Sequence, residues 1–289
     1  MKIARADERQ WQRFASHRKG LLQNKRLLSG TEGLPDNYEL SIVDVAGDYE
    51  TPPHKHNFDQ IRFQLVGSFG YGESEDEVQE EGSIGYFPEG TAYAQRSVGH
   101  CRTLLLQFGG NSGAGFMSYA QLERGQAKLL ERGDFAHGKF QEKSGTDEAA
   151  EKDAYEAIWE EVNGRRIEYP QPRYRAPIIA TPESFGWVPL PGQEGCTARA
   201  CGSFGERAVA FGFIAVEPSR HLALLPHRLY YVVSGTGNCG DEPVGEGCAI
   251  DPDGGTDLVV QAVEPLVLVY LDRPSFGDEA GAGTARPAA

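Results

Sequence analysis

The chain has 289 residues, enough for two domains without disulfide support, and its 36 Gly, 17 Pro and 10% aromatic residues favour many short strands over a helix bundle. A formal net charge of −14 predicts no nucleic-acid partner, because nucleic-acid binding needs clustered Lys and Arg. The polar N-terminus lacks the apolar core of a signal peptide, and no run approaches the roughly 18 apolar residues that cross a bilayer, so we expect a cytoplasmic protein without a membrane partner.

Short predicted strands follow one another from Leu40 to Phe108. Gly, Pro and acidic residues separate them at intervals typical of turns. The segments are 40–47, 61–72, 81–90, 91–97 and 103–110. Their spacing predicts a compact β unit.

In the segments 118–133 and 146–166, apolar residues recur at the spacing of a helix and not at that of a strand. The residues at this spacing are Leu122, Leu129, Tyr155, Ile158, Trp159 and Val162. We expect two amphipathic connecting helices whose apolar residues pack into a core. Thr146 or Asp147 suits the N-cap of the second helix, and Gly164 followed by two arginines suits its end.

A second β unit extends from about Gly186 to Pro274. Its segments are 208–219, 229–237, 246–255 and 257–274. They repeat the first unit's pattern of short apolar segments separated by turn residues, which indicates an internal duplication. We therefore divide the chain into a first β domain at 1–115, a helical connector at 116–168, a second β domain at 169–275 and a flexible tail at 276–289.

The five cysteines indicate free thiols. Their number is odd and no pair has the CxxC spacing of redox or zinc sites. They are Cys101, Cys196, Cys201, Cys239 and Cys248.

His54 and His56 are the most informative polar residues. Only one residue separates them, so on a strand both side chains point to the same side and can chelate one ion. Continuing this parity gives Gln60, Arg62 and Gln64, whereas Ile61, Phe63 and Leu65 take the opposite side. The pattern predicts one polar and one apolar face, although a surface strand with its polar face in water would show it too.

A second motif consists of Gly82, Pro88 after five intervening residues, Gly90, and Tyr93 three positions later. With Gly47, His54, His56, Gln60 and Gly67, it resembles the two motifs of the cupin superfamily. The resemblance implies an all-β fold with connecting helices, in which two jelly-roll barrels share one chain and the site lies in a lumen. It also implies that the apolar face packs outward on another element or subunit, which is compatible with a homodimer.

The resemblance further implies a metal site, usually formed by three His and one Glu. In this chain Gln60 takes the place of the Glu and Tyr93 that of the third His. We expect His54, His56 and Gln60 to bind a divalent metal, with Fe(II) favoured and Mn, Ni, Zn or Cu as alternatives. His100, in an expected turn, is another candidate ligand. The remaining alternative is a metal-free pocket with two hydrogen-bonded histidines.

The second β domain lacks this site. When Gly235 is aligned on Gly67, Leu222 and Leu224 stand opposite the two histidines, and leucine cannot bind a metal. Arg228 falls opposite the first domain's glutamine. We expect the second barrel to serve as scaffold.

The first functional hypothesis that the resemblance allows is a metal-dependent dioxygenase acting on a small phenolic or polar organic substrate. Arg62 and Tyr93 would be catalytic, and they would bind the substrate together with Gln64 and Gln95. Arg62 would pair with a substrate carboxylate or phenolate, unless it forms a salt bridge with a nearby acid such as Asp59.

Two alternatives need no redox chemistry. One is an isomerase, epimerase or lyase in which His54 or His56 moves a proton and Tyr93 is the partner acid. The other is a module that binds a small metabolite without transforming it.

Overall fold

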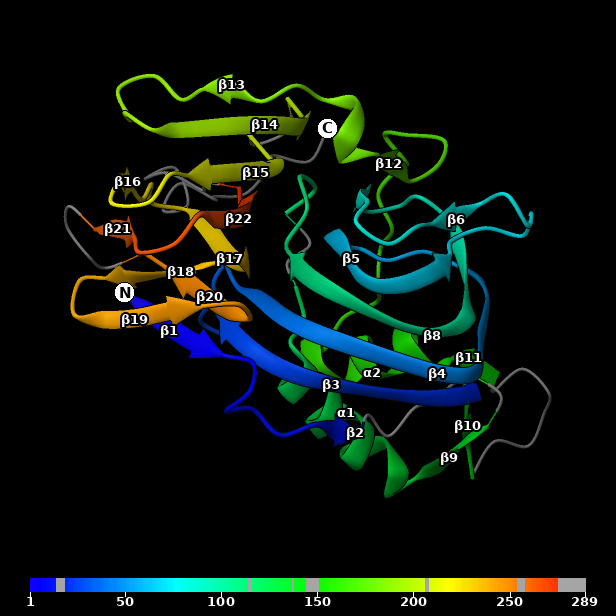
Figure 1. Cartoon of the computed structure of the whole chain (residues 1–289). Helices are drawn as coiled ribbons and strands as arrows, with labels where there is room; N and C mark the ends of the chain where they lie inside the picture. The colour runs from blue at the N-terminus through cyan, green and yellow to red at the C-terminus, as the bar shows by residue number, and fades with distance from the viewer. Residues whose placement is uncertain are drawn as a thin grey trace, which may run out of the picture.

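Two β-barrels and a helical connector make up the fold (Figure 1). The computed structural model describes residues 1–13, 19–113, 116–136, 138–143, 151–205, 208–253 and 258–274. Strands dominate this part of the chain, and every strand pair in it is antiparallel. The expected all-β class with connecting helices is confirmed.

The first barrel is formed by long strands that bend around its lumen. Its sheet runs in the order β12-β7-β5-β8-β4-β3-β2, and β6 pairs with β5. The strands are β2 (Gln12–Arg13), β3 (Lys19–Ser29), β4 (Tyr38–His54), β5 (Asp59–Gly70), β6 (Val78–Gln79), β7 (Ile84–Phe87), β8 (Tyr93–Phe108) and β12 (Ile178–Ala180). Register shifts between Thr51 and His54 and along β5 mark bulges, which allow long strands to bend. The segments 91–97 and 103–110, expected as two strands, belong to the single strand β8.

The second barrel consists of two sheets. The seven-stranded sheet contains β1 (Lys2–Arg5), β20 (Cys248–Asp251), β17 (Arg228–Ser234), β22 (Leu266–Asp272), β15 (Ala210–Val216), β14 (Cys196–Ser203) and β13 (Val188–Pro189). The four-stranded sheet contains β16 (His221–Ala223), β21 (Val259–Ala262), β18 (Thr236–Cys239) and β19 (Glu242–Gly245). All five cysteines are free and buried, as expected.

The two barrels exchange strands. The N-terminal strand β1 pairs with β20 of the second barrel, and β12, which follows the connector, pairs with β7 of the first. The domain bounds proposed from the sequence stay a prediction, but hydrogen-bonded pairing crosses them at both places.

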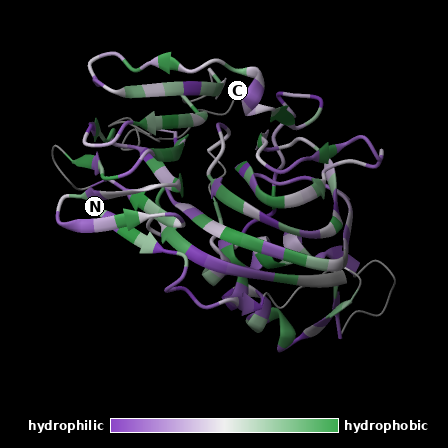
Figure 2. Ribbon diagram, viewed as in Figure 1, coloured by the Kyte–Doolittle hydropathy of each residue, from purple (hydrophilic) through white to green (hydrophobic). Residues whose placement is uncertain are grey.

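The interface between the barrels is apolar. Ile61 and Phe63 of β5 are buried there together with Phe211, Phe213 and Leu229 of the second barrel. The rings of Phe63 and Phe213 have centroids 5.4 Å apart. The apolar face of β5 is therefore covered within the chain, and Figure 2 shows hydrophobic positions recurring along the strands of both barrels.

The connector supplies two helices and a small sheet. Its elements are α1 (Tyr119–Leu130), β9 (Gly133–Ala136), β10 (Lys139–Glu142), β11 (Glu151–Asp153) and α2 (Ala154–Asn163). A short 3₁₀ helix, η2 (Pro182–Ser184), follows β12. A capping box of Ser118 and Gln121 starts α1. Asp153 caps α2, and Gly164 ends it in the left-handed conformation. The expected caps Thr146 and Asp147 lie outside the described residues. None of the helices in the described ranges is long and apolar enough to span a membrane.

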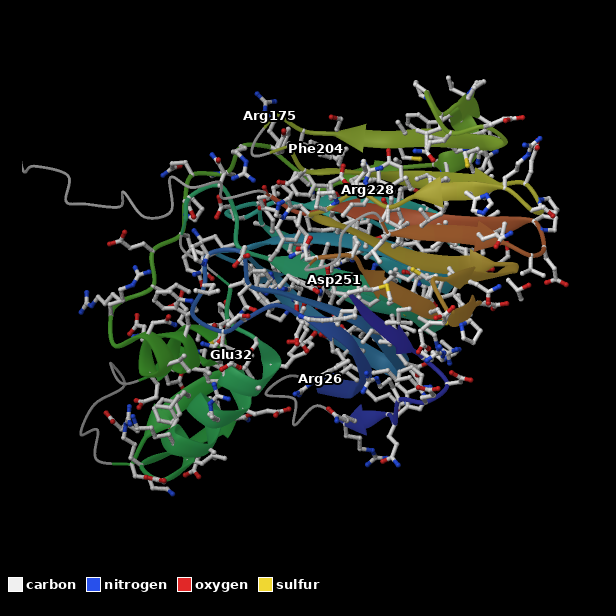
Figure 3. All side chains as sticks on the ribbon, turned by 90° about the vertical axis from the view of Figure 1, so that its left-hand side faces the viewer. Arg26, Glu32, Arg175, Phe204, Arg228 and Asp251 are labelled. Carbon is white, nitrogen blue, oxygen red and sulfur yellow. The ribbon has the colours of Figure 1, made fainter. Side chains whose placement is uncertain are left out.

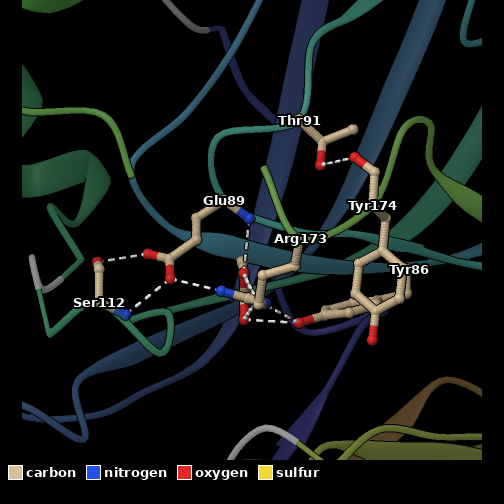
Figure 4. A network of polar contacts seen from close by, with 7 residues as sticks. Tyr86, Glu89, Thr91, Ser112, Arg173 and Tyr174 are labelled. Atoms are coloured by element: carbon tan, nitrogen blue, oxygen red, sulfur yellow. Dashed lines mark hydrogen bonds and ion pairs between the residues drawn. The ribbon is translucent and has the colours of Figure 1, made fainter. Parts of the chain in front are cut away.

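A buried ionic network fastens the segment after α2 to the first barrel (Figure 4). Arg173 donates to Glu89 at 2.6 Å and to both carboxylate oxygens of Asp59 at 3.1 Å. Glu89 also accepts from the backbone N–H of Ser112 at 2.7 Å, and the hydroxyl of Tyr86 donates to Asp59 at 2.8 Å. Asp59 therefore pairs with Arg173 and not with Arg62.

Candidate functional site

The first barrel encloses a cavity of about 140 Å³. Polar side chains of β4, the loop after it, β5 and β8 form part of its wall, and the rest of the wall is largely apolar. The polar lining residues on these elements are Tyr49, His54, His56, Gln60, Arg62, Gln95, Thr103 and Gln107. The apolar part includes Val43, Val45, Phe58, Phe69, Leu105, Phe116, Met117 and Leu122. Such a cavity, mostly apolar with a few convergent polar groups, is typical of a small-molecule site.

His54 and His56 both face this cavity, as expected, but not from one strand. His54 is the last residue of β4, and His56 lies in the loop before β5. Their ring centroids are 5.0 Å apart and the rings lie nearly perpendicular. The end of β4, and not a continuous strand, therefore separates the two histidines.

The hydrogen-bond partners of the two rings favour opposite tautomers. Nδ1 of His54 lies 2.9 Å from the carbonyl oxygen of Pro52, which can only accept, so Nδ1 carries the proton and Nε2 the lone pair. Nδ1 of His56 lies 2.9 Å from the amide nitrogen of Gln60, which can only donate, so here Nδ1 is the acceptor and Nε2 carries the proton.

Arg62 determines the orientation of the Gln60 amide. The oxygen Oε1 of Gln60 accepts from Nε of Arg62 at 3.0 Å and from Nη2 at 2.7 Å. The amide nitrogen must therefore face His56 and the hydroxyl of Tyr93, which lies 3.1 Å away. Reversing the amide would turn its N–H groups toward a guanidinium, so Arg62 indirectly sets the tautomer of His56.

Tyr93 lies behind the cavity wall and links the other groups. Its hydroxyl accepts from Nη2 of Arg62 at 2.9 Å and lies 2.9 Å from Nδ1 of His56. Because Arg62 and Gln60 supply donors to this oxygen, the hydroxyl proton faces Nδ1 of His56, whose lone pair the hydroxyl shares with the Gln60 amide. The arrangement is a short hydrogen-bonded chain from Arg62 through Tyr93 to His56.

The other two predicted substrate-binding residues have different environments. Gln95 lines the cavity, and in the amide orientation that satisfies both its ends it accepts from Arg62 Nη2 at 2.8 Å and donates to the Tyr49 hydroxyl at 3.0 Å. Gln64 is not among the lining residues; it accepts from Thr103 at 2.8 Å and donates to the carbonyl of Val66 at 2.9 Å. The fold thus brings Gln95, but not Gln64, to the candidate site.

These residues do not fit the metal centre that the cupin resemblance implies. Both acceptor positions of Gln60 Oε1 are directed at Arg62, so this oxygen is not available as a ligand. The His56 tautomer leaves neither ring nitrogen with a lone pair for a metal, and the guanidinium of Arg62 adds a positive charge beside the site. Within the described ranges there is also no group of three or more His, Cys, Asp or Glu side chains placed to hold an ion.

His100, the other candidate ligand, lies elsewhere. It belongs to β8 and not to a turn, its side chain is half exposed, and its Nε2 lies 2.9 Å from a carboxylate oxygen of Asp44. Asp44 also pairs with Arg102. Its interpretation as a ligand of the His54 and His56 site is therefore wrong.

Sequence reasoning missed the contribution of tyrosines to the cavity. Tyr49 of β4, Tyr119 of α1 and Tyr155 of α2 all line it. Burial raises the pKa of Tyr119, so its phenol stays protonated at neutral pH. The helical spacing assigned Tyr155 to core packing, and it does pack there, but its ring also lies 5.5 Å from that of His56.

A second hollow shares two lining residues with the cavity. It is lined by Lys55, Asp153, Glu156 and Tyr169 together with the shared His54 and Tyr155. These two side chains therefore face both spaces.

Comparisons with known proteins identify the fold. No family model matches the chain, and no curated protein matches its sequence. Among solved structures, a provisionally assigned dioxygenase from Nostoc punctiforme has 11% identity and a TM-score of 0.54, covering 94% of this chain and 82% of its own. A provisionally assigned glyoxylate-induced protein from Pseudomonas aeruginosa has 12% identity and a TM-score of 0.54, covering 90% and 82%.

Oxalate decarboxylase from Bacillus subtilis, described with Mn(II) centres, has 13% identity and a TM-score of 0.51, covering 96% of this chain and 78% of its own. These are cupin-fold proteins, and the chain has the same two-barrel fold along most of its length. At such identities the likeness extends to the fold and not to the activity.

Proposed function

We propose that the cavity of the first barrel binds a small organic molecule and transfers a proton within it, as in a non-redox isomerase, epimerase or lyase. The observation that carries this proposal is the difference between the Nδ1 partners of the two rings, a carbonyl oxygen at His54 and an amide nitrogen at His56, which favours opposite tautomers. One imidazole can take a proton at Nε2 and the other can give one, so a base and an acid stand on the same wall.

His54 is the proposed general base. Pro52 holds its Nδ1 proton at 2.9 Å, and this hydrogen bond stabilises the imidazolium that forms when Nε2 accepts a proton from substrate carbon. The electron pair of the broken C–H bond moves into an adjacent unsaturated group of the substrate, so no external oxidant or reductant is required.

His56 is the proposed general acid, with Tyr93 as its proton reservoir. When Nε2 of His56 gives its proton to the substrate, the Tyr93 hydroxyl can pass its own proton to Nδ1 over 2.9 Å, which avoids an imidazolate. The resulting phenolate would lie 2.9 Å from Nη2 of Arg62, whose charge stabilises it. Proton return from His54 to Nε2 of His56 through product or water, with the Nδ1 proton of His56 passing back to the Tyr93 oxygen, restores the starting state.

Deuterium exchange tests this function without a known product. Metal-stripped protein would be incubated in D₂O with 2-oxo acids, 2-hydroxy acids and β,γ-unsaturated acids, along with their methyl esters, while NMR follows loss of the C–H signal. We expect exchange on at least one compound, and a reduction of about 10²- to 10⁴-fold in His54→Ala and His56→Ala. Tyr93→Phe keeps the ring but removes the reservoir, so exchange should slow by at least about tenfold.

His221→Ala is the matched control, because His221 is an exposed histidine on β16 of the second barrel. Exchange at the wild-type rate in the two cavity variants would contradict the proposal. Exchange that disappears with a chelator and returns with one divalent metal would instead support metal chemistry.

A metal-dependent oxygenase is the second candidate. Two imidazoles with centroids 5.0 Å apart on one cavity wall favour it, and the similar structures include a provisionally assigned dioxygenase and an enzyme with Mn(II) centres. It requires Gln60 and His56 to reorient. Elemental analysis of the purified protein and of the His54→Ala, His56→Ala double variant distinguishes it, since this candidate alone predicts stoichiometric metal that the variant loses.

A further inference from the structure

Arg62 is a buried cation whose observed partners are all neutral. Its residue is 5% exposed, and within the described ranges no carboxylate lies within ion-pair distance of its guanidinium. It donates to Gln60 and Tyr93, and its Cζ lies 4.1 Å from the ring centroid of Phe87. These groups orient the guanidinium but do not neutralise its charge.

The other buried arginine among the described residues is neutralised. Arg273 is 6% exposed and pairs with Asp251 and Asp253. Arg228 on β17 of the second barrel (Figure 3) is only half-buried, and it too forms a two-pronged pair, with Asp272. Because an uncompensated buried charge is costly, the chain elsewhere supplies a carboxylate partner. The difference at Arg62 points to a partner from outside the chain.

The cavity limits what that partner can be. Nη1 of Arg62, on the side away from Gln60, has no acceptor among the described residues except the Gln95 oxygen at 3.2 Å. One guanidinium suits a single negative charge and matches a carboxylate geometrically. A cavity of about 150 Å³ holds benzene, so the apolar walls around about 140 Å³ suit a body the size of one six-membered ring.

We propose that the site recognises a small monocarboxylic acid, with its carboxylate on Arg62 and a ring-sized apolar body against the walls formed by Val43, Val45, Phe69 and Leu105. This inference rests on the cavity being the substrate site, as proposed above, but not on the reaction performed there. The carboxylate would replace the Gln95 oxygen at Nη1, while Nη2 keeps its bond to Tyr93.

Calorimetric titration with shape-matched probes tests the inference. Benzoate and cyclohexanecarboxylate carry the charge, whereas benzamide and benzyl alcohol have similar size without it, and phenyl phosphate carries more charge. We expect wild-type protein to bind at least one carboxylate about ten- to hundredfold more tightly than its neutral counterpart and than phenyl phosphate. Arg62→Met should remove this preference and keep weak binding of the neutral probes.

Arg124→Met is the control, because Arg124 is exposed and pairs with Glu32 outside the cavity. Equal affinity for benzoate and benzamide in the wild type, or failure of every acid to bind, would overturn the inference even if Arg62→Met does not fold. Carboxylate binding without proton exchange would contradict the proposed function alone. Proton exchange confined to the methyl esters would contradict the carboxylate inference alone.

Discussion

The two barrels use the same strand plan around very different interiors. β5 lies between β7 and β8 in the first barrel, and β17 lies between β20 and β22 in the second. The first interior keeps a cavity beside buried Gln60 and Arg62. The second is filled by an apolar cluster that includes Leu222, Leu224 and Val232. The two barrels therefore share a strand plan and differ in the side chains of their interiors.

The duplication also shows in the backbone. Gly67 and Gly235 both have positive φ, and a Cβ would lie 2.4 Å from a carbonyl oxygen at the first position and 2.0 Å at the second. Only glycine fits either turn. Both halves share this backbone constraint, whereas the sequence alignment of the halves places leucines opposite the two histidines of the proposed site.

Replacing the two histidines of the first lumen by the leucines of the second should change the proton-exchange activity more than any other substitution. His54→Leu with His56→Leu gives the first barrel the residues of the second and removes both proposed proton-transfer groups. We expect the rate of deuterium exchange into the substrate to fall by about 10²- to 10⁴-fold or more. The far-UV circular dichroism spectrum, which reports the fold, should stay unchanged. Retention of more than about a tenth of the exchange rate would show that other groups move the proton. His221→Leu is the control on an exposed strand.

Removing Arg173 should destabilise the hollow barrel strongly. Arg173→Met leaves the carboxylates of Asp59 and Glu89 buried without their cation, so we expect a loss of about 3–5 kcal/mol in the free energy of unfolding by urea denaturation. Arg124→Met breaks only an exposed pair and should cost less than about 1 kcal/mol. Equal losses in the two variants would contradict the role given to this network.

The filled interior of the second barrel should not accept a histidine. Leu222 is 1% exposed, and Leu222→His places a polar ring in a packed apolar cluster, which should cost about 3–5 kcal/mol in urea denaturation. Ala223→His, on the same strand but exposed, should change stability by less than about 0.5 kcal/mol. If Leu222→His and Ala223→His have the same free energy of unfolding, the interior of the second barrel can accommodate a histidine, and its description as filled is wrong.

Glu39 should give the first barrel a pH-dependent stability. Burial raises its pKa to about 7, although Arg26 and the backbone N–H of Tyr119 favour its charged form. Because the folded state then holds this proton more tightly than the unfolded state, its contribution is present below the unfolded pKa of 4.5 and is lost as pH rises through 7. The loss is about 3 kcal/mol at most.

Glu39→Gln should remove this decline, which urea denaturation between pH 4.5 and pH 8 would measure. The equivalent strand β15 of the second barrel has no acidic residue and offers no comparable group. An identical pH dependence in the variant and the wild type would contradict this assignment.

The sequence by itself determined the strand-rich class, and it predicted two similar β units and the position of the candidate pocket. Glycines and prolines at fixed intervals mark turns, because backbone conformation is a local property. The opposite faces of β5 were also predictable, since alternation along a strand separates Gln60 and Arg62 from Ile61 and Phe63. The comparison of the two halves likewise predicted that the second barrel lacks the histidine pair.

Only the tertiary structure decided what the pocket residues do. The metal prediction rested on residue types at a familiar spacing, but Gln60 is oriented by Arg62, and His56 takes its tautomer from Gln60. These hydrogen bonds depend on how the loop before β5 and the strands β5 and β8 come together in space. The spacing of residues along the sequence does not contain that information. The contributions of Tyr119 and Tyr155 and the exchange of β1 and β12 are equally non-local. The residues that offer chemistry were visible in the sequence, whereas their protonation and partners follow from long-range packing.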